Sequence, residues 1–251
     1  MPNWVKTRLS FNGDLEAAKK LKELVTSTYE KENYAGEKVL DSSGNVIICT
    51  NEFDFNKVIP MPEDLNVTSG STGEWGMRYI QLKDKQPIVW SDDDKEFMDR
   101  MEKEDPKQLK EAIELGQKYL NNLAKYGCKT WYEWRCKYWN TKWGCADPQW
   151  DDDTTVWFDT AWSFAAPIVE KLSEMFPTLT IEFAYADEDC GSNTGEGEIK
   201  NGDYLRENYP DTGSNEAYEL YKELWDCNDF VYDEETDTYK WIDEFDEDED
   251  A

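Results

Sequence analysis

Carboxylate side chains are the groups in this sequence whose type and spacing could support chemistry, because the chain contains no histidine. Its absence removes the commonest general base, the Ser-His and Cys-His nucleophile pairs, and imidazole metal ligands. Carboxylates that hold Mg²⁺ together with substrate phosphates remain. The candidate runs are residues 92–94, 151–153 and 187–189. Because 56 acidic residues make such runs common on solvated loops, we expect no metal site and no bound cofactor.

Three further motifs give weak signals. Residues 187–193 place Asp, Asp, Gly and Asn at alternate positions, but the Gly comes one position too early for a calcium loop, so a polar turn is favoured. The six cysteines form no C-x-x-C pair, and free, mostly buried thiols are expected. Gly70, Gly73 and Gly76 lack the preceding strand and following Lys-Ser/Thr of a nucleotide-binding loop.

The segment 131–143 combines aromatic residues with the most basic stretch of the chain. On a helix its aromatic side chains would form a broad stripe that could stack bases or pack in a core. The surrounding negative charge would oppose an incoming phosphate within a Debye length of about 8 to 10 Å. Core packing is therefore the favoured interpretation. The residues are Trp131, Trp134, Tyr138, Trp139 and Trp143, interleaved with Arg135, Lys137 and Lys142.

The overall charge excludes a second class of function. Lys and Arg total 27 against 56 Asp and Glu, a net charge of -29 over 251 residues, which would repel a nucleic-acid backbone. Direct binding of DNA or RNA is not expected. The sequence shows neither a signal-peptide pattern nor an apolar run of roughly 20 residues, so we expect a cytoplasmic protein without a membrane contact.

The order of the expected elements predicts an α+β fold. Alternating and helical periodicities give the order β-α-β-β-α-β, which is the ferredoxin-like split βαβ arrangement, an antiparallel sheet with two helices on one face. A short hairpin is also expected at 39–49. The expected strands are 4–11, 53–59, 156–161 and 180–186, and the expected helices are 15–29 and 167–176.

Three parts are expected along the chain. Residues 1–202 would form the ferredoxin-like domain, carrying a large helical, Trp-rich insertion at about 66–150. Residues 203–242 would add a C-terminal helix and a hairpin packed on that domain. The acidic residues 243–251 would form a disordered tail, because seven of the eight residues from 243 to 250 are carboxylates.

Short motifs also follow one another in a recognisable order. They are Pro2-Asn3-Trp4, Ile59-Pro60-Met61-Pro62-Glu63, Trp131-Tyr132-Glu133-Trp134, Trp139-Asn140-Thr141-Lys142-Trp143 and Phe158-Asp159-Thr160-Ala161-Trp162-Ser163. Together they resemble the YubB-type ferredoxin-like family of conjugative plasmids and phages. The resemblance implies the fold and a mobile-element origin, but no active site. It marks as family-motif residues Trp4, Trp131, Trp134, Trp143, Asp159 and Trp162.

The charge and the resemblance together predict a function. A net charge of magnitude about 2 to 8 is enough to keep a small domain soluble, and -29 is far larger. We therefore expect a non-enzymatic phage or plasmid protein that acts as an acidic nucleic-acid mimic. It would occupy the basic groove of a host nucleic-acid-binding protein, such as a defence nuclease or a CRISPR-type complex, as an anti-defence or anti-CRISPR protein.

The expected partner-binding surface lies in the C-terminal part, where 13 carboxylates after residue 225 face a single basic residue, Lys240. One alternative is a metal-dependent enzyme acting on a phosphorylated or nucleotide substrate through 151–153 and 187–189. Another is a purely structural accessory protein. The expected partner-binding residues are Asp226, Asp229, Asp233, Glu234, Glu235, Asp237, Asp243, Glu244, Asp246 and Glu247.

Overall fold

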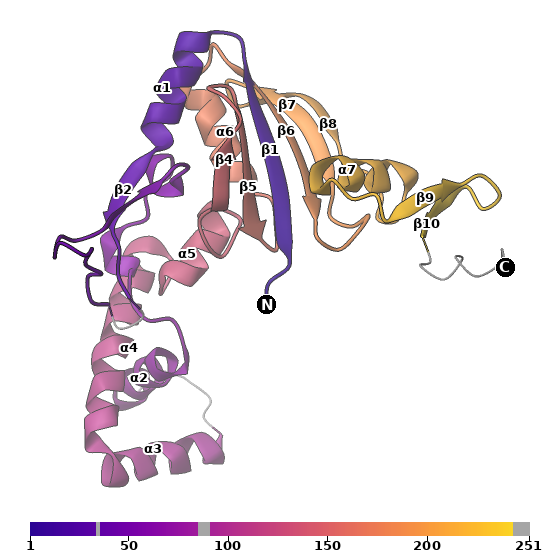
Figure 1. The fold of residues 1–251 in the computed structure, drawn as a ribbon. Coiled ribbons are helices and arrows are strands. Elements are labelled where there is room, and N and C mark those ends of the chain that lie inside the picture. The colour runs from indigo at the N-terminus through magenta and orange to yellow at the C-terminus, as the bar shows by residue number, and fades with distance from the viewer. Residues whose placement is uncertain (34–35, 85–90, 243–251) are drawn as a thin grey trace. The chain divides into compact units, whose positions relative to one another are not determined.

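The chain folds into two compact units. A computed structural model describes residues 1–33, 36–84 and 91–242, without the side chains of residues 93, 94, 97, 98 and 241. The first unit comprises Met1–Pro60 and Trp139–Ala251, and the second comprises Met61–Tyr138 (Figure 1). The second unit overlaps the helical insertion expected at about 66–150, but it ends twelve residues earlier.

A six-stranded antiparallel sheet forms the core of the first unit. Its order is β4-β5-β1-β6-β7-β8, so β1 lies between β5 and β6 and pairs antiparallel with both. The two neighbours of β1 therefore run parallel to each other. The strands are β1 Trp4–Asn12, β4 Ala146–Trp150, β5 Thr155–Ala161, β6 Thr180–Asp187, β7 Gly195–Lys200 and β8 Asp203–Asn208.

The sheet contains the ferredoxin-like split βαβ arrangement, but its second strand is not the expected one. Helix α1 (Leu15–Val25) connects β1 to β4, and helix α6 (Ala166–Met175) connects β5 to β6. Each connection skips one strand position, because β5 separates β1 from β4 and β1 separates β5 from β6. The next strand of this sheet after α1 is thus β4, near residue 150, and the expected strand at 53–59 is wrong.

Residues 53–59 form a short 3₁₀ helix, η1 (Phe55–Lys57), instead of a strand. The Asp54 carboxylate accepts a hydrogen bond from the Asn56 N–H and caps this helix, as Asp commonly does. Phe53 and Phe55 are both buried, which gave the sequence its alternating pattern. Phe53 stacks on Phe158 with centroids 5.0 Å apart, so aromatic packing and not strand pairing explains the alternation.

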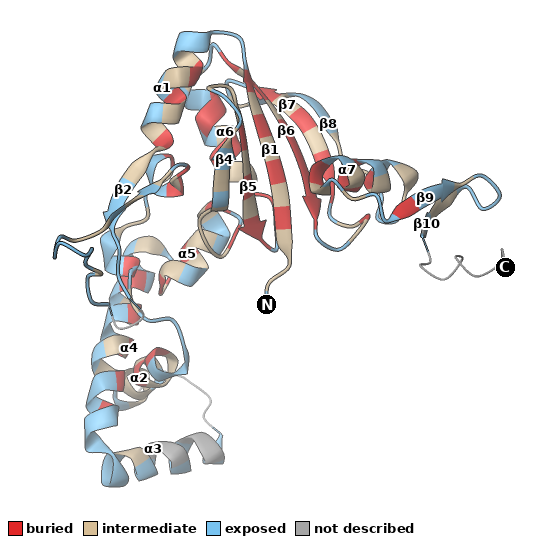
Figure 2. Cartoon of the chain, in the orientation of Figure 1, coloured by how far each residue is buried: buried red, intermediate tan, exposed pale blue. Residues whose placement is uncertain are grey.

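The two faces of the sheet are covered by different helices. Buried and partly exposed residues alternate along β1, as Figure 2 shows. The fully buried face includes Val5 and Leu9, and α1 and α6 pack on it. Helix α7 (Asn215–Trp225) packs on the other face, against Ala184 and Ala186 of β6. Two crossover helices on one face confirm the expected ferredoxin-like layers.

Strands β7 and β8 extend the sheet beyond the split βαβ arrangement. They pair through a tight turn at Asn201 and Gly202, both with positive φ. The boundary expected between residues 202 and 203 therefore divides one hairpin. Gly197 on β7 lies beneath Phe183, where an added Cβ would come within 2.6 Å of the ring. A glycine in this strand gives the aromatic ring room to pack against the backbone.

Two short hairpins complete the first unit. Strands β2 (Ser27–Glu30) and β3 (Ile48–Asn51) pair with each other, and the hairpin expected at 39–49 is reduced to one isolated bridge between Leu40 and Val46. Strands β9 (Phe230–Asp233) and β10 (Thr238–Trp241) form the expected C-terminal hairpin. The expected tail at 243–251 lies outside the described residues.

The second unit is helical. A 3₁₀ helix, η2 (Glu63–Leu65), precedes α2 (Ser71–Lys83), α3 (Asp92–Glu104), α4 (Pro106–Tyr126) and α5 (Trp131–Tyr138). Helix α4 begins as expected, with Asp105 as N-cap and Pro106 in the first turn, and ends at Gly127 in the left-handed conformation. Local sequence signals therefore determine both ends of this helix.

Glycine residues allow α2 and α4 to approach closely. A Cβ added to Gly76 would lie 1.6 Å from the Ala112 carbonyl oxygen, and one added to Gly116 would lie 2.1 Å from the Met77 nitrogen. A Cβ on Gly73 would clash with the Tyr119 ring at 2.3 Å. Gly73 and Gly76 of the G-x-x-G-x-x-G string thus serve helix packing, and Gly70 is the N-cap of α2.

We predict that Gly76→Ala destabilises the second unit by about 3 kcal/mol, because the new methyl group has to push two helix backbones apart. Thermal unfolding followed by the helical circular dichroism signal measures this effect. The variant should lose that signal at a lower temperature than the wild type. Gly144→Ala is the control, since its added Cβ would meet no atom within 4 Å. Equal melting of both variants would contradict the packing role of Gly76.

Candidate functional site

The charged face of the sheet beneath α7 holds the candidate functional site. Side chains at alternate positions of β1, including Lys6 and Arg8, share this face with their cross-strand partners, because directly opposed residues point to the same side. The Lys6 partner on β5 is Asp159, and the Arg8 partner is Trp157. Polar groups on a sheet interior need partners or solvent, and here α7 supplies the partners.

Apolar and ionic contacts together fix α7 on this face. Leu220, Tyr221 and Leu224 form one buried cluster with the small side chains of β6. Arg8 of β1 forms an ion pair with Glu223 of α7, and the Lys6 ammonium lies 4.3 Å from the centroid of the Trp225 ring. The two cations of the central strand are therefore used to hold the helix.

An acidic hollow lies on one side of α7, between the helix and the edge strands β7 and β8. Its volume is about 690 Å³. Glu216 and Glu219 are exposed, and their carboxylates form no hydrogen bond or ion pair with any residue that the structure describes. We call this the acidic hollow. Its lining residues are Glu196, Asn208, Asn215, Glu216, Glu219, Leu220, Lys222 and Glu223.

The cations around the acidic hollow already have partners. Arg206 contacts Glu196 at 3.1 Å and Glu198 at 3.5 Å. The Lys222 ammonium lies 5.0 Å from the Tyr239 ring centroid. Since these cations are held by other groups, Glu216 and Glu219 keep their negative charge available to a ligand from outside.

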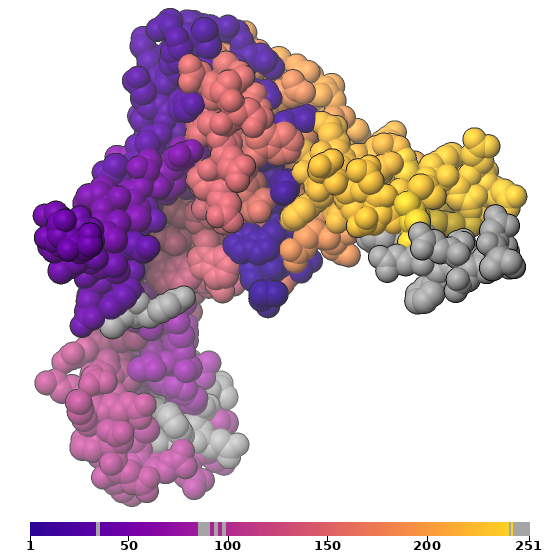
Figure 3. Space-filling model, in the orientation of Figure 1, coloured from indigo at the N-terminus to yellow at the C-terminus, as the bar shows by residue number. Residues whose placement is uncertain are grey.

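A second hollow, the Asp159 hollow, lies on the other side of α7 over β1, β4 and β5. In Figure 3, β1 (indigo) is visible between β4 and β5 on one side and the yellow C-terminal segment on the other. The hollow has a volume of about 520 Å³. The Trp157 indole N–H donates to Asp151 at 2.8 Å and so fixes one wall. Its lining residues are Lys6, Asp147, Gln149, Asp151, Trp157, Phe158, Asp159 and Leu224.

Asp159 is half-buried, and burial raises the pKa of its carboxyl group. Lys6 opposes this change, whereas Asp147 and Glu188 add to it by repulsion between like charges. Burial and the neighbouring carboxylates therefore both oppose ionisation of Asp159. Asp159 was expected only as a motif residue, and the structure places it in a solvent-accessible hollow.

The C-terminal carboxylates expected to bind a partner differ in their availability. Asp233 forms an ion pair with Lys240, which holds the pKa of its carboxyl group at about 2. Asp237 accepts a hydrogen bond from the Tyr232 hydroxyl at 2.5 Å. Asp237 is exposed, as are Asp226, Asp229, Glu234 and Glu235. The expected residues Asp243, Glu244, Asp246 and Glu247 lie outside the described part of the chain.

The expected motif tryptophans do not form one site. Trp131 and Trp134 lie on α5 in the second unit. Trp4 and Trp143 belong to the first unit and contact each other with ring centroids 6.1 Å apart. Trp162 follows β5 and is 54% exposed. The family-motif positions thus serve different parts of the fold.

The basic aromatic segment is mainly used for packing. Trp134 and Trp139 are buried, in agreement with the expected core role. Three cations of the segment lie over aromatic rings, at centroid distances of 5.2, 5.0 and 4.4 Å. Because neighbouring rings bind these cations, the segment is a poor platform for bases. The pairs are Arg135 with Trp131, Lys137 with Tyr138 and Lys142 with Trp143.

The acidic runs also have structural roles where they are described. Asp187 is buried and accepts hydrogen bonds from Asn3, from Asn193 and from the Asp189 N–H. It therefore closes the polar turn that was favoured over a calcium loop. Asp152 accepts N–H bonds from Thr154 and thereby stabilises its own turn. No group of three Cys, Asp or Glu side chains is arranged for a metal ion within the described residues.

The cysteines are free, as expected, but only Cys128 is buried. Cys136 is exposed and the other four are partly exposed, so the expectation of mostly buried thiols is wrong. Burial raises the pKa of Cys145 to about 12, and its thiol donates to the Phe53 carbonyl oxygen. A thiol held in its neutral form is a weak nucleophile.

Sequence reasoning missed the acidic hollow. Its helix residues Glu216, Glu219 and Glu223 are spaced three and four apart, which places them on one face of α7. That spacing was a usable signal. The contribution of Glu196 was hidden, because it depends on the pairing of β7 with β8.

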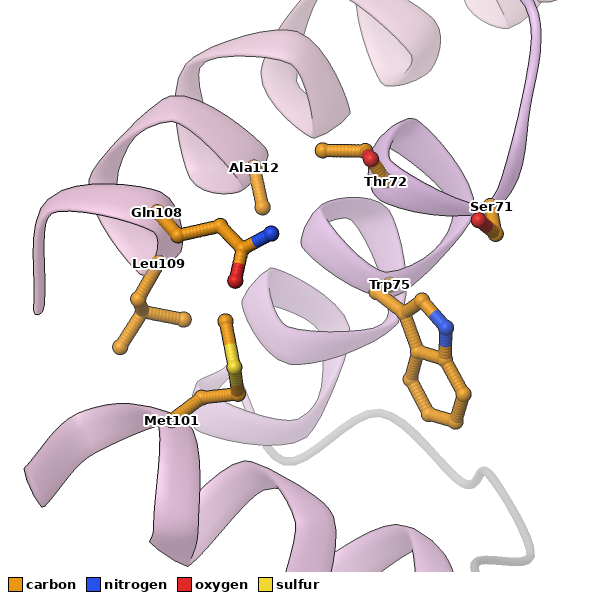
Figure 4. A pocket seen from close by; sticks show the side chains of 7 residues that line it. All are labelled: Ser71, Thr72, Trp75, Met101, Gln108, Leu109 and Ala112. Carbon is orange, nitrogen blue, oxygen red and sulfur yellow. The ribbon is translucent and has the colours of Figure 1, made fainter. Parts of the chain in front are cut away.

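A separate pocket lies between helices of the second unit. Figure 4 shows Met101 of α3 and Gln108 of α4 pointing toward each other in it. Its volume is only about 140 Å³, and none of the described residues that line it has an ionisable side chain. It therefore lacks the charge that distinguishes the sheet face.

A match to one protein-family model supports the fold. Residues 138–228, less than half of the chain, match a family model described as a ferredoxin-like domain in Api92-like protein. This match confirms the expected ferredoxin-like fold, whereas the YubB-type resemblance stays a prediction. The crystal structure of a protein api92 from Yersinia pseudotuberculosis is similar at 12% identity with a TM-score of 0.39, over 85% of this chain and 99% of that chain.

Two further findings are negative. A search of curated proteins finds no match to the chain. Among the described residues, no helix combines the length and the apolar composition that crossing a bilayer requires.

We predict that Asp159→Asn raises the free energy of unfolding at pH 7. The raised pKa means that ionising Asp159 costs more in the folded state than in the unfolded chain, and asparagine removes this cost. The gain should disappear as the pH falls below about 3.9, where the carboxyl group is protonated in both states. Urea unfolding across this pH range measures it.

Asp211→Asn is the matched control for this experiment, because Asp211 is exposed in the loop before α7. It removes the same charge without the burial. A gain at pH 7 that is no larger than that of the control would show that only the net charge, and not the environment of Asp159, is responsible.

Proposed function

We propose that this protein is a non-enzymatic interaction protein that binds a basic, nucleic-acid-binding protein through its acidic face. In this proposal the carboxylates stand in for the phosphates of a nucleic acid and keep the partner from its natural ligand. Complementary charge would speed the encounter and select the partner. The observation that carries the proposal is the acidic hollow beside α7.

The acidic hollow has the properties that such binding needs. Four carboxylates and one ammonium group line it, and Glu216 and Glu219 have no ion pair among the described residues. A volume of about 690 Å³ can receive several lysine or arginine side chains. Arginine and lysine are the residues with which proteins contact phosphates, so a phosphate-binding groove supplies matching groups.

The C-terminal hairpin and the residues before it add further negative charge next to the acidic hollow. Exposed Asp226 and Asp229 follow α7 directly, and Glu234 and Glu235 lie at the tip between β9 and β10. These four residues were predicted from the sequence as partner-binding, and they add carboxylates next to the helix that borders the acidic hollow. The proposed surface therefore combines α7 with the hairpin.

The resemblance to YubB-type proteins of plasmids and phages supports a particular class of partner. An element that enters a bacterial cell meets nucleases and CRISPR-type complexes that bind nucleic acid. We propose such a host defence protein as the partner, because its basic groove has the required charge.

We predict that the double variant Glu216→Gln, Glu219→Gln binds the partner about fivefold more weakly, since two exposed ion pairs of roughly 0.5 kcal/mol each are lost. Immobilised wild type and variant are incubated with bacterial lysate at 50 and roughly 300 mM salt, and the captured proteins are identified. Duplex DNA should release the captured partner, and the partner's own DNA binding should decrease when this protein is added.

The charge-matched control is Glu111→Gln, Glu114→Gln on α4, where both residues pair with lysines of the same helix. This control should behave as wild type. Capture that resists high salt, or a purified partner that binds DNA equally well with and without this protein, would contradict the proposal.

A further inference from the structure

Trp162 combines exposure with a strained backbone. Its φ angle is 72°, in the left-handed region, which bulky side chains rarely adopt. Every other non-glycine residue with positive φ in the described chain is Asn or Asp, the types that tolerate this conformation. Strain of this kind persists only where the surrounding structure imposes it, and it is commonly found at functional sites.

Hydrogen bonds hold Trp162 in this conformation. Its N–H donates to the Asn3 carbonyl oxygen at 2.9 Å, and its carbonyl oxygen accepts from the Asn193 side chain at 3.4 Å. Asn3 and Asn193 also donate to the two carboxylate oxygens of buried Asp187, both at 3.2 Å. The rigid turn therefore directs a large indole ring toward solvent.

The ring of Trp162 differs from the other tryptophan rings in its surroundings. Of the ten tryptophan side chains that the structure describes, six carry a lysine or arginine of this chain over the ring, at 4.3 to 5.7 Å from its centroid. Trp134 and Trp139 are buried, and Trp4 packs on Trp143. Trp162 is the one exposed ring, and no described cation covers it.

Carboxylates follow Asp187 on a second turn, which the Asn193 side chain joins to the Trp162 backbone. Glu188 and Asp189 follow Asp187 in the same turn and are both exposed. Their carboxylates form no hydrogen bond or ion pair with a described residue. An exposed aromatic ring and free carboxylates on two turns that are joined by hydrogen bonds are suited to a planar cation.

We propose that Trp162 is an anchor for an arginine side chain of the partner, whose guanidinium stacks on the indole while Glu188 or Asp189 accepts its hydrogen bonds. This inference rests on the proposed function, because it identifies one contact of the same basic partner. Arginine is favoured over lysine, since its planar group both stacks and pairs with a carboxylate. The missing cation over Trp162 is thus supplied by the partner.

A synthetic hexa-arginine peptide tests this proposal. The wild type, labelled with ¹⁵N at its indoles, is titrated with the peptide, and the Trp162 signal is assigned by its absence in Trp162→Gly. We expect that signal to shift and the variant to bind about fivefold more weakly, as expected for an exposed cation–π contact. Glycine suits the left-handed φ, so the variant should melt within about 3 °C of wild type.

Tyr29→Ala is the control, because Tyr29 is an aromatic residue with the same 54% exposure. It should bind as wild type. Suppose that the peptide binds the wild type and binds the Glu216→Gln, Glu219→Gln variant more weakly, while Trp162→Gly binds it as tightly as wild type. That result would overturn the arginine anchor and leave the proposed function standing. If wild type does not bind the peptide at all, the proposed function fails and this inference fails with it.

Discussion

Repulsion among carboxylates is the constraint on which the rest of this structure depends. The chain has 56 acidic and 27 basic residues, so roughly half of its carboxylates cannot have a cation of their own. Some cations are therefore shared between two carboxylates. Lys38, Lys129 and Arg206 each contact two glutamates. Other cations lie over aromatic rings inside the units. Positive charge is thereby concentrated on internal contacts, and the carboxylates that remain without a partner lie at the surface.

The central strand links this charge distribution to the sheet. One face of β1 is fully buried and mainly apolar, with Thr7 as its polar residue, whereas the other presents Lys6 and Arg8 to α7. The helix consequently sits where two cations and the small residues Ala184 and Ala186 meet. Its position creates a hollow on each side. The acidic hollow and the Asp159 hollow are thus products of how α7 is held, and not separate additions to the fold.

Local signals predicted much of this architecture, and non-local pairing explains what they missed. The caps of α4 and the C-terminal hairpin are encoded within a few residues and were predicted correctly. Phe53 and Phe55 alternate as in a strand, yet their partners are aromatic rings far along the chain. The left-handed conformation of Trp162 has no local signal, because it is imposed by Asn3 and Asn193. The spacing of Glu216, Glu219 and Glu223 predicts that they share one face of a helix. The strand that completes their hollow could not be predicted from local sequence.

The long separation in sequence between β1 and β5 has a consequence for how the protein is made. Strand β1 ends at Asn12, but its first partner strand, β5, begins only at Thr155. At synthesis rates of about 5 to 20 residues per second, β1 emerges from the ribosome roughly 7 to 29 seconds before the first residue of β5 does. During this interval the second unit, whose helices are contiguous in sequence, can already fold, because local contacts form faster than distant ones. The nascent chain thus leaves its central strand as an open edge until late in translation, and the charge of Lys6 and Arg8 protects that edge from pairing with other chains.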